Sequence, residues 1–143
     1  MNFLESAIHD LKRTKLQTEK AVAQLQDHEL HWQADSESNS IAIIMKHMAG
    51  NMLSRWTDFL TTDGEKSTRN RDGEFVDDFK SRADLMAYWE RGWQCLFAAL
   101  ESLRLEDMDK TVLIRGEVHS VPLAIVRQLG HYSLHARSEE HTS

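Results

Sequence analysis

The sequence contains one cysteine, Cys95, and one proline, Pro122, in 143 residues. A single cysteine excludes an internal disulfide and fits a protein that stays in a reducing cytoplasm. The scarcity of proline, together with abundant Leu, Ala, Glu, Lys and Gln, favours helices over most of the chain. No apolar run reaches the ~18 residues that a membrane-spanning helix needs, and the N-terminal segment has no signal-peptide core. We therefore expect a cytoplasmic protein with no membrane partner.

The chain also lacks the positive charge that nucleic-acid binding requires. It has 17 Lys and Arg against 23 Asp and Glu, which gives a formal net charge of −6, whereas phosphate backbones select a basic face. A chain of this length can form one domain around its own hydrophobic core. We expect one domain over residues 1–136 and no nucleic-acid partner.

Apolar residues recur at helical spacing in four segments, three of which begin at a residue that can act as an N-cap. These caps are Asn39 or Ser40 for the second segment, Ser81 for the third and Ser120 for the fourth. The expected helices cover about residues 2–26, 40–59, 81–103 and 120–136.

The segments between the helices differ in character. Residues 27–40 are rich in Asp, Ser and Asn and predict a loop, and the polar residues 61–80 predict a long connection. The β-branched run TVLIRGEVHSV predicts a short hairpin from about Lys110 to Val121. The expected fold is an all-α antiparallel four-helix bundle with a short β-hairpin between helices three and four, or an up-down variant in which residues 61–80 form a long crossover.

Three histidines suggest a metal site. His131 and His135 are four residues apart, so they lie 40° apart on one face of the last helix, one turn from each other. Two imidazoles in this position can bind one metal ion, but a third protein ligand must come from elsewhere. His47 lies in the middle of the second helix, on the flank of an apolar stripe, beside the small residues Gly50 and Ser54. These neighbours leave room for an inward imidazole, and the alternative for His47 is a hydrogen-bonded core histidine.

Other polar residues are weaker candidates. We expect His9, His28 and His31 to lie on the solvated surface. His119 should pack at the edge of a strand or support the metal ligands from outside the site. His141 falls in the tail that we expect to be foreign. We expect Asn51 either to orient a bound ligand or to lie on the helix surface, Tyr132 to pack in the core, and Cys95 to be an inert core residue.

The segments HMAGNM, TVLIRGEVHSV and RQLGHYSLH resemble the DinB-like superfamily, most closely its branch with IMKH-x-AGN-M and QLGHY-x-x-H, and the resemblance covers about residues 2–135. It implies a four-helix bundle, often dimeric, in which one histidine of helix two and two of helix four hold a divalent metal. By position these ligands are His47, His131 and His135. Some members of the superfamily carry out thiol chemistry, as in bacillithiol transferases and mycothiol-dependent maleylpyruvate isomerase.

A three-histidine site fits Zn²⁺ or Ni²⁺, with Fe²⁺ or Mn²⁺ as alternatives, and it leaves a coordination position open, as catalytic sites do. We therefore expect a metal-dependent enzyme, a thiol S-transferase or a hydrolase, that acts on a small molecule such as a low-molecular-weight thiol. The alternative is a non-catalytic, stress-associated, metal-binding homodimer. A di-iron carrier is excluded because the expected Glu-x-x-His pairs are missing.

The last seven residues, RSEEHTS, depart from the register of the family. This peptide is one translation of the start of a common short-read sequencing adaptor. We expect residues 137–143 to be a non-native tail and the natural sequence to differ beyond Ala136.

Overall fold

The computed structural model of the protein describes residues 2–33, 35 and 39–142, with side chains described as far as Ala136. Over these residues the chain forms five α-helices, two short 3₁₀ helices and one two-stranded antiparallel sheet. The mostly helical fold with a small hairpin agrees with the sequence. The side chains of residues 137–143 are not described, so the non-native tail at these residues stays a prediction.

Helix α1 spans Phe3–Ala23, and its Glu5 N–H donates to the side chain of Asn2 at 2.9 Å. The residues that α1 buries are Ala7, Leu11, Thr14, Thr18 and Val22. The chain then forms the one-turn helix α2, Asp27–Leu30, where a loop was predicted. Leu30 is only 1% exposed, so burial of this side chain accounts for a helical turn inside an otherwise polar segment.

Helices α3, Ile41–Trp56, and α4, Arg82–Ser102, begin at the predicted caps. The Ile43 N–H donates to Ser40 Oγ at 3.2 Å, and the Asp84 N–H donates to Ser81 Oγ at 3.1 Å. The predicted apolar stripe of α4 is buried over its whole length, at Leu85, Trp89, Trp93, Leu96, Leu100 and Leu103.

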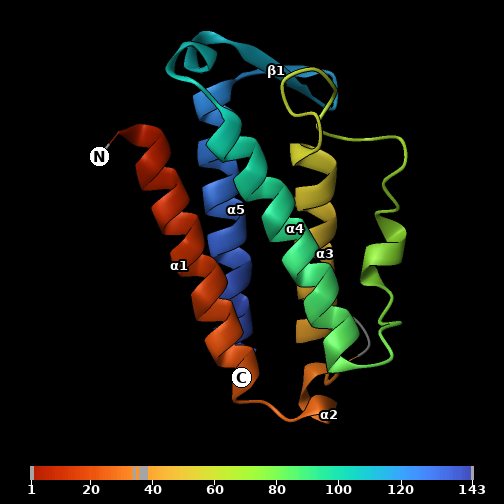
Figure 1. Cartoon of the computed structure of the whole chain (residues 1–143). Coiled ribbons are helices and arrows are strands. Elements are labelled where there is room, and N and C mark those ends of the chain that lie inside the picture. The colour runs from red at the N-terminus through yellow and green to blue at the C-terminus, as the bar shows by residue number, and fades with distance from the viewer. Residues whose placement is uncertain (1, 34, 36–38, 143) are drawn as a thin grey trace.

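The long connection between α3 and α4 sets the direction of the helices. It runs along the outer side of α3 and returns the chain to the end where α3 began (Figure 1). Helices α3 and α4 therefore point the same way, while α1 and α5, Val121–Thr142, point the other way. This order is not antiparallel throughout, and it agrees with the variant that has a long crossover. The crossover also contains a 3₁₀ helix, η1, at Asp72–Phe75, which the sequence did not predict.

Strands β1, Thr111–Ile114, and β2, Glu117–Ser120, form the predicted hairpin, which follows the 3₁₀ helix η2, Leu105–Asp109. Its two turn residues, Arg115 and Gly116, both have positive φ, 54° and 75°. This is the geometry of a type I′ turn, whose twist matches that of the strands. The hairpin lies across the end of the helices where α3 and α4 finish (Figure 1).

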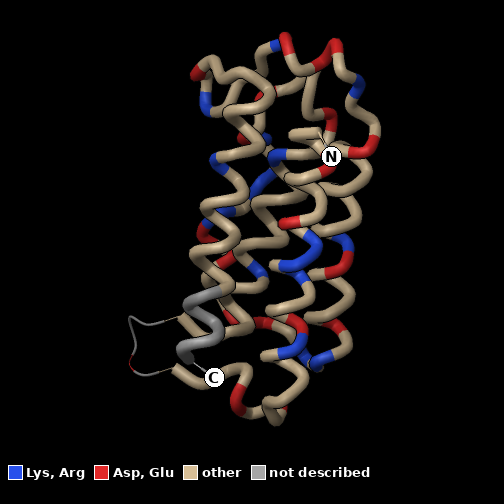
Figure 2. Tube along the Cα trace, turned by 90° about the vertical axis from the view of Figure 1, so that its left-hand side faces the viewer, with Lys and Arg blue, Asp and Glu red and all other residues tan. Residues whose placement is uncertain are grey.

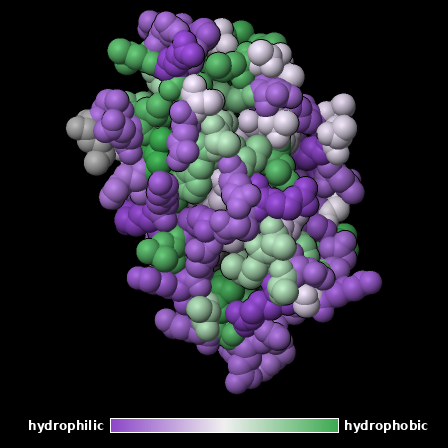
Figure 3. Space-filling view, in the orientation of Figure 1, coloured by the Kyte–Doolittle hydropathy of each residue, from purple (hydrophilic) through white to green (hydrophobic). Residues whose placement is uncertain are grey.

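Charged residues of both signs are mixed along the chain, with no continuous basic stripe in the view of Figure 2. On the face shown in Figure 3, hydrophilic residues surround small, separate hydrophobic areas. None of the described helices combines the length and the apolar character needed to cross a membrane.

Candidate metal centre

The fold brings His47 of α3 together with His131 and His135 of α5. One ring nitrogen from each of the three side chains lies within 4.8 Å of the other two. The Nε2 atoms of His131 and His135 are 2.9 Å apart, and the ring of His47 is centred 5.6 Å and 5.0 Å from theirs. The two parts of the predicted site, the i,i+4 pair and the mid-helix histidine, therefore meet between α3 and α5.

The surroundings keep the pair on α5 neutral. Burial lowers the pKa of His131 to about 4, with further contributions from the other two histidines and from the positive charges of Arg55 and Arg69. Burial, followed by the proximity of His47, lowers the pKa of His135 to about 4 as well. Both imidazoles are thus uncharged at neutral pH, the state in which a histidine nitrogen can bind a metal ion.

The third histidine is held by a carboxylate from the crossover. His47 Nδ1 lies 2.9 Å from Glu74 Oε1. Because an ionised carboxylate only accepts hydrogen bonds, Nδ1 carries a proton, and Nε2 is the nitrogen that remains for a metal ion. Carboxylates commonly fix metal-binding histidines in this way.

Glu74 is itself paired with a buried arginine. Arg69 donates from Nε to Glu74 Oε2 at 2.8 Å and from Nη2 to Oε1 at 2.9 Å. The side chains of Arg69 and Glu74 are only 3% and 5% exposed. Burial acts to raise the pKa of Glu74, but the hydrogen bonds from Arg69 and His47 outweigh it and the pKa lies below its usual value. Glu74 is therefore ionised at neutral pH.

Gly50 makes the position of Glu74 possible. A Cβ atom at Gly50 would lie 2.5 Å from Glu74 Oε2 and 2.7 Å from its Cδ. Contacts this short do not occur, so any larger residue at position 50 would displace the carboxylate from α3.

The outer side of the site is aromatic. The ring of Phe75, the residue after Glu74, stacks on His47 with centroids 5.4 Å apart and an interplanar angle of 26°. Phe75 is 48% exposed.

Asn51 has a structural partner in the core. It is 2% exposed and accepts a hydrogen bond from the Tyr132 hydroxyl at 2.5 Å. Trp56 Nε1 donates to the same hydroxyl at 3.4 Å, and burial raises the pKa of Tyr132 above its usual value. The expectation of core packing for Tyr132 is confirmed, whereas a helix-surface place for Asn51 is wrong.

The other described histidines lie apart from the cluster. His9 and His28 are exposed, and His31 contacts Asp77 at 2.5 Å. The ring of His119 is buried, with Nε2 2.5 Å from Arg127 Nη1. His141 lies outside the residues whose side chains are described, and Cys95 is half-buried against the core, with Sγ 3.4 Å from Thr57 Oγ1.

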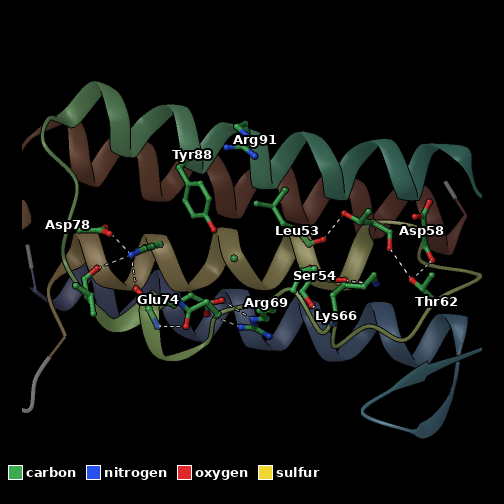
Figure 4. A pocket seen from close by; sticks show the side chains of 17 residues that line it. Leu53, Ser54, Asp58, Thr62, Lys66, Arg69, Glu74, Asp78, Tyr88 and Arg91 are labelled. Carbon is green, nitrogen blue, oxygen red and sulfur yellow. Dashed lines mark hydrogen bonds and ion pairs between the residues drawn. The ribbon is translucent and has the colours of Figure 1, made fainter.

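A polar cavity of about 880 Å³ adjoins the site between α3, α4 and the crossover. Tyr88 points from α4 toward α3, and Arg69 and Glu74 lie on the opposite side (Figure 4). Lys66 donates to the carbonyl oxygens of Ser54 and Asp63 at 2.7 Å and 2.6 Å. Arg69 and Glu74 line this cavity, and the three clustered histidines do not.

Comparisons with known proteins agree with this fold. The sequence model of the family described as "Protein of unknown function (DUF1572)" matches residues 1–138. The crystal structure of a conserved protein from Enterococcus faecalis is similar over 99% of this chain and 95% of that chain, with a TM-score of 0.75 and 14% sequence identity. At this identity the similarity is one of fold. No curated protein matches the chain.

Proposed function

We propose that this chain, which belongs to the DUF1572 family, binds one divalent metal ion through His47, His131 and His135. The proposal depends on one observation, the three ring nitrogens within 4.8 Å of one another. Nitrogen ligands of a tetrahedral ion with metal–nitrogen distances of about 2.1 Å lie about 3.4 Å apart. Small side-chain rotations would bring the cluster to this spacing.

The chemistry of the donor set supports the same ligands. Two histidines are neutral, and the third presents Nε2 because Glu74 accepts the proton-bearing Nδ1. Neutral imidazoles suit Zn²⁺ or Ni²⁺, with Fe²⁺ and Mn²⁺ as alternatives. The resemblance to the DinB-like superfamily, with its four-helix bundle, points to the same three residues.

A metal-dependent enzyme that acts on a small molecule is the function that this site supports best. Three protein ligands leave a position for a substrate or water, and the half-exposed Phe75 stacks on the ring of His47. When bound, the ion would supply Lewis-acid chemistry and lower the pKa of a coordinated water or thiol. We therefore propose a thiol S-transferase or a hydrolase, in the cytoplasm, in which Glu74 holds His47 in its ligating tautomer.

A homodimer is the proposed assembly, and a non-catalytic metal-binding dimer is the second candidate function. Helix α5 carries Leu123, Val126 and Leu134, which are 47%, 48% and 58% exposed. Their spacings of three and eight residues place them on one face of the helix. A second copy of the chain could cover this apolar stripe.

Elemental analysis of the purified full chain tests the metal site. We expect about one equivalent of a divalent metal in the wild type and a loss of at least tenfold in affinity for His47→Ala and His131→Ala. The matched control is His28→Ala, because His28 is exposed on α2, and it should bind as the wild type does. Equal metal retention in all three variants would place the metal elsewhere.

A turnover screen separates the two candidate functions. Metal-loaded protein is offered thiols together with electrophilic acceptors, and esters or amides as substrates for hydrolysis. Turnover that disappears with a chelator supports the enzyme, and a loaded protein inactive in every arm supports the non-catalytic dimer.

A further inference from the structure

Four arginines from three segments converge beside the histidine cluster. Arg69, Arg71 and Arg115 place guanidinium nitrogens 3.1 Å, 3.3 Å and 2.8 Å from the carboxylate of Glu65. Arg55 of α3 joins them, because its Nη1 donates at 3.1 Å to the carbonyl oxygen of Gly64, the residue before Glu65. The crossover, α3 and the hairpin turn therefore meet at an arginine cluster, defined as Arg55, Arg69, Arg71 and Arg115.

The positive charge of this cluster is only partly neutralised. The carboxylates that its guanidinium groups contact are Glu65 and Glu74. The nearby carboxylate of Asp63 instead accepts the backbone N–H groups of Glu65, Arg115 and Gly116 at 2.7 Å, 2.8 Å and 2.8 Å. Asp63 still carries a negative charge near Arg55, so four guanidinium groups lie near three carboxylates, a local excess of one positive charge in a chain whose net charge is −6. Such an excess attracts anions.

The cluster also has hydrogen-bond donors to spare. A guanidinium group has five N–H donors, and the buried Nε of Arg55 has no acceptor among the described residues. Arg71 and Arg115 each bond to Glu65 through one nitrogen, and their side chains are 48% and 50% exposed. Forked donors of this kind match the oxygens of carboxylates and phosphates.

The backbone at Arg115 points to a role for its side chain. Its φ of 54° lies in the left-handed region, which disfavours residues other than Gly, Asn and Asp. Asn-Gly is the favoured pair for this turn, yet the sequence has Arg-Gly. Arginine is therefore conformationally unfavourable at this position. Its side chain nevertheless places a guanidinium group 2.8 Å from the Glu65 carboxylate.

A chain of contacts connects the arginine cluster to the histidines. Arg69 bonds to both Glu65 and Glu74, and Glu74 bonds to His47. The exposed Arg71 and Arg115 are therefore connected to His47 through Glu65, Arg69 and Glu74.

We propose that Arg55, Arg71 and Arg115 bind an oxyanion, a carboxylate or phosphate group, of the small molecule whose reacting end reaches the histidine cluster. The claim that the reacting end reaches the histidines rests on the proposed function, but the claim that the arginines bind an anion does not. Arg55 supplies a half-buried charge, and Arg71 and Arg115 supply accessible donors at the surface.

Titration of the chelator-treated full chain tests this site. The probes are inorganic phosphate and acetate at constant ionic strength, followed by NMR shifts of the arginine N–H groups and of neighbouring backbone amides. Because asparagine suits the left-handed turn, Arg115→Asn should keep the melting temperature of the wild type while it weakens anion binding about fivefold to tenfold. Arg55→Gln should weaken binding to a similar degree. The control is Arg13→Gln, whose side chain is 65% exposed and pairs with Asp10 on α1, and it should change nothing.

Binding of either probe that weakens in both cluster variants supports the site, and the tighter probe identifies the group that it selects. Absence of binding by both probes, or equal affinity in wild type and both variants, would overturn the inference. His131→Ala separates this site from the proposed function, because that variant should lose metal and still bind the anion. A protein that binds metal but neither probe would refute the anion site and leave the metal site standing.

Discussion

Gly50→Ala is the substitution that should disturb the metal site most selectively without removing a ligand. The new Cβ would lie 2.5 Å from Glu74 Oε2 and 3.1 Å from its Cγ. The carboxylate must therefore leave its place against α3. The move breaks the hydrogen bonds of Glu74 to His47 and Arg69, which are 2.9 Å and 2.8 Å long.

Two opposing terms set the change in the free energy of unfolding. Replacing glycine by alanine inside a helix stabilises it by about 1 kcal/mol. Breaking the buried pair with Glu74 costs less than the about 3–5 kcal/mol of a pair whose remaining charge is left alone, because Arg69, 3% exposed, keeps its bond to Glu65 at 3.1 Å. The loss wins, and we expect Gly50→Ala to lower the free energy of unfolding by about 1–3 kcal/mol. Losing the partner of a ligating histidine should also weaken metal binding about 10–100-fold.

Chemical denaturation and a metal titration measure the two effects, and Gly130→Ala is the matched control. Gly130 lies within α5, and a Cβ there meets nothing within 4 Å. We expect this control to be slightly more stable than the wild type and to bind metal with unchanged affinity. A Gly50→Ala protein as stable as the wild type, with the same metal affinity, would refute the role assigned to Glu74.

Two further predictions concern pH and assembly. His131 and His135 have pKa values of about 4 in the folded protein and 6.5 when unperturbed. As pH falls, the unfolded chain therefore takes up protons before the folded protein does. The free energy of unfolding that these histidines contribute is complete above about pH 6.5 and is lost toward pH 4. Chemical denaturation of the metal-free protein between pH 4 and 7 should show this slope, and a His131→Ala, His135→Ala double variant with an identical slope would contradict it. On α5, Val126 is 48% exposed, and Val126→Lys should convert a wild-type dimer into a monomer in sedimentation velocity at micromolar concentration. A monomeric wild type would contradict the proposed dimer.

The parts of the fold that depend on neighbours in sequence were predictable. Ser40, Ser81 and Ser120 each accept a hydrogen bond from the N–H three residues ahead, and this short-range geometry is readable as a cap followed by an apolar stripe. The pairing of His131 with His135 is local in the same sense, because both lie one helical turn apart. The one-turn helix α2 escaped prediction because a tertiary contact, the burial of Leu30, stabilises it.

The surroundings of the metal site could not be predicted in this way. Glu74 reaches His47 across 27 residues of sequence, from a 3₁₀ turn inside a polar segment that has no helical periodicity. Its partner Arg69 is buried although the composition around it indicates a solvated loop. Asn51 was expected either to orient a bound ligand or to lie on the helix surface, because nothing in the sequence shows that Tyr132 packs against it. Glu74 reaches His47 because the crossover runs along α3, and this tertiary path cannot be read from the local sequence.

The central claim is that the three histidines hold one metal ion, and a crystal structure of the metal-loaded protein tests it most directly. Data collected at the absorption edge of the bound metal should show one anomalous peak per chain between α3 and α5. The account predicts nitrogen atoms of His47, His131 and His135 about 2.0–2.1 Å from that peak, with His47 Nδ1 still bonded to Glu74. A metal-loaded crystal with no peak at these residues, or with a peak that lacks any one of the three histidines as a ligand, would contradict it.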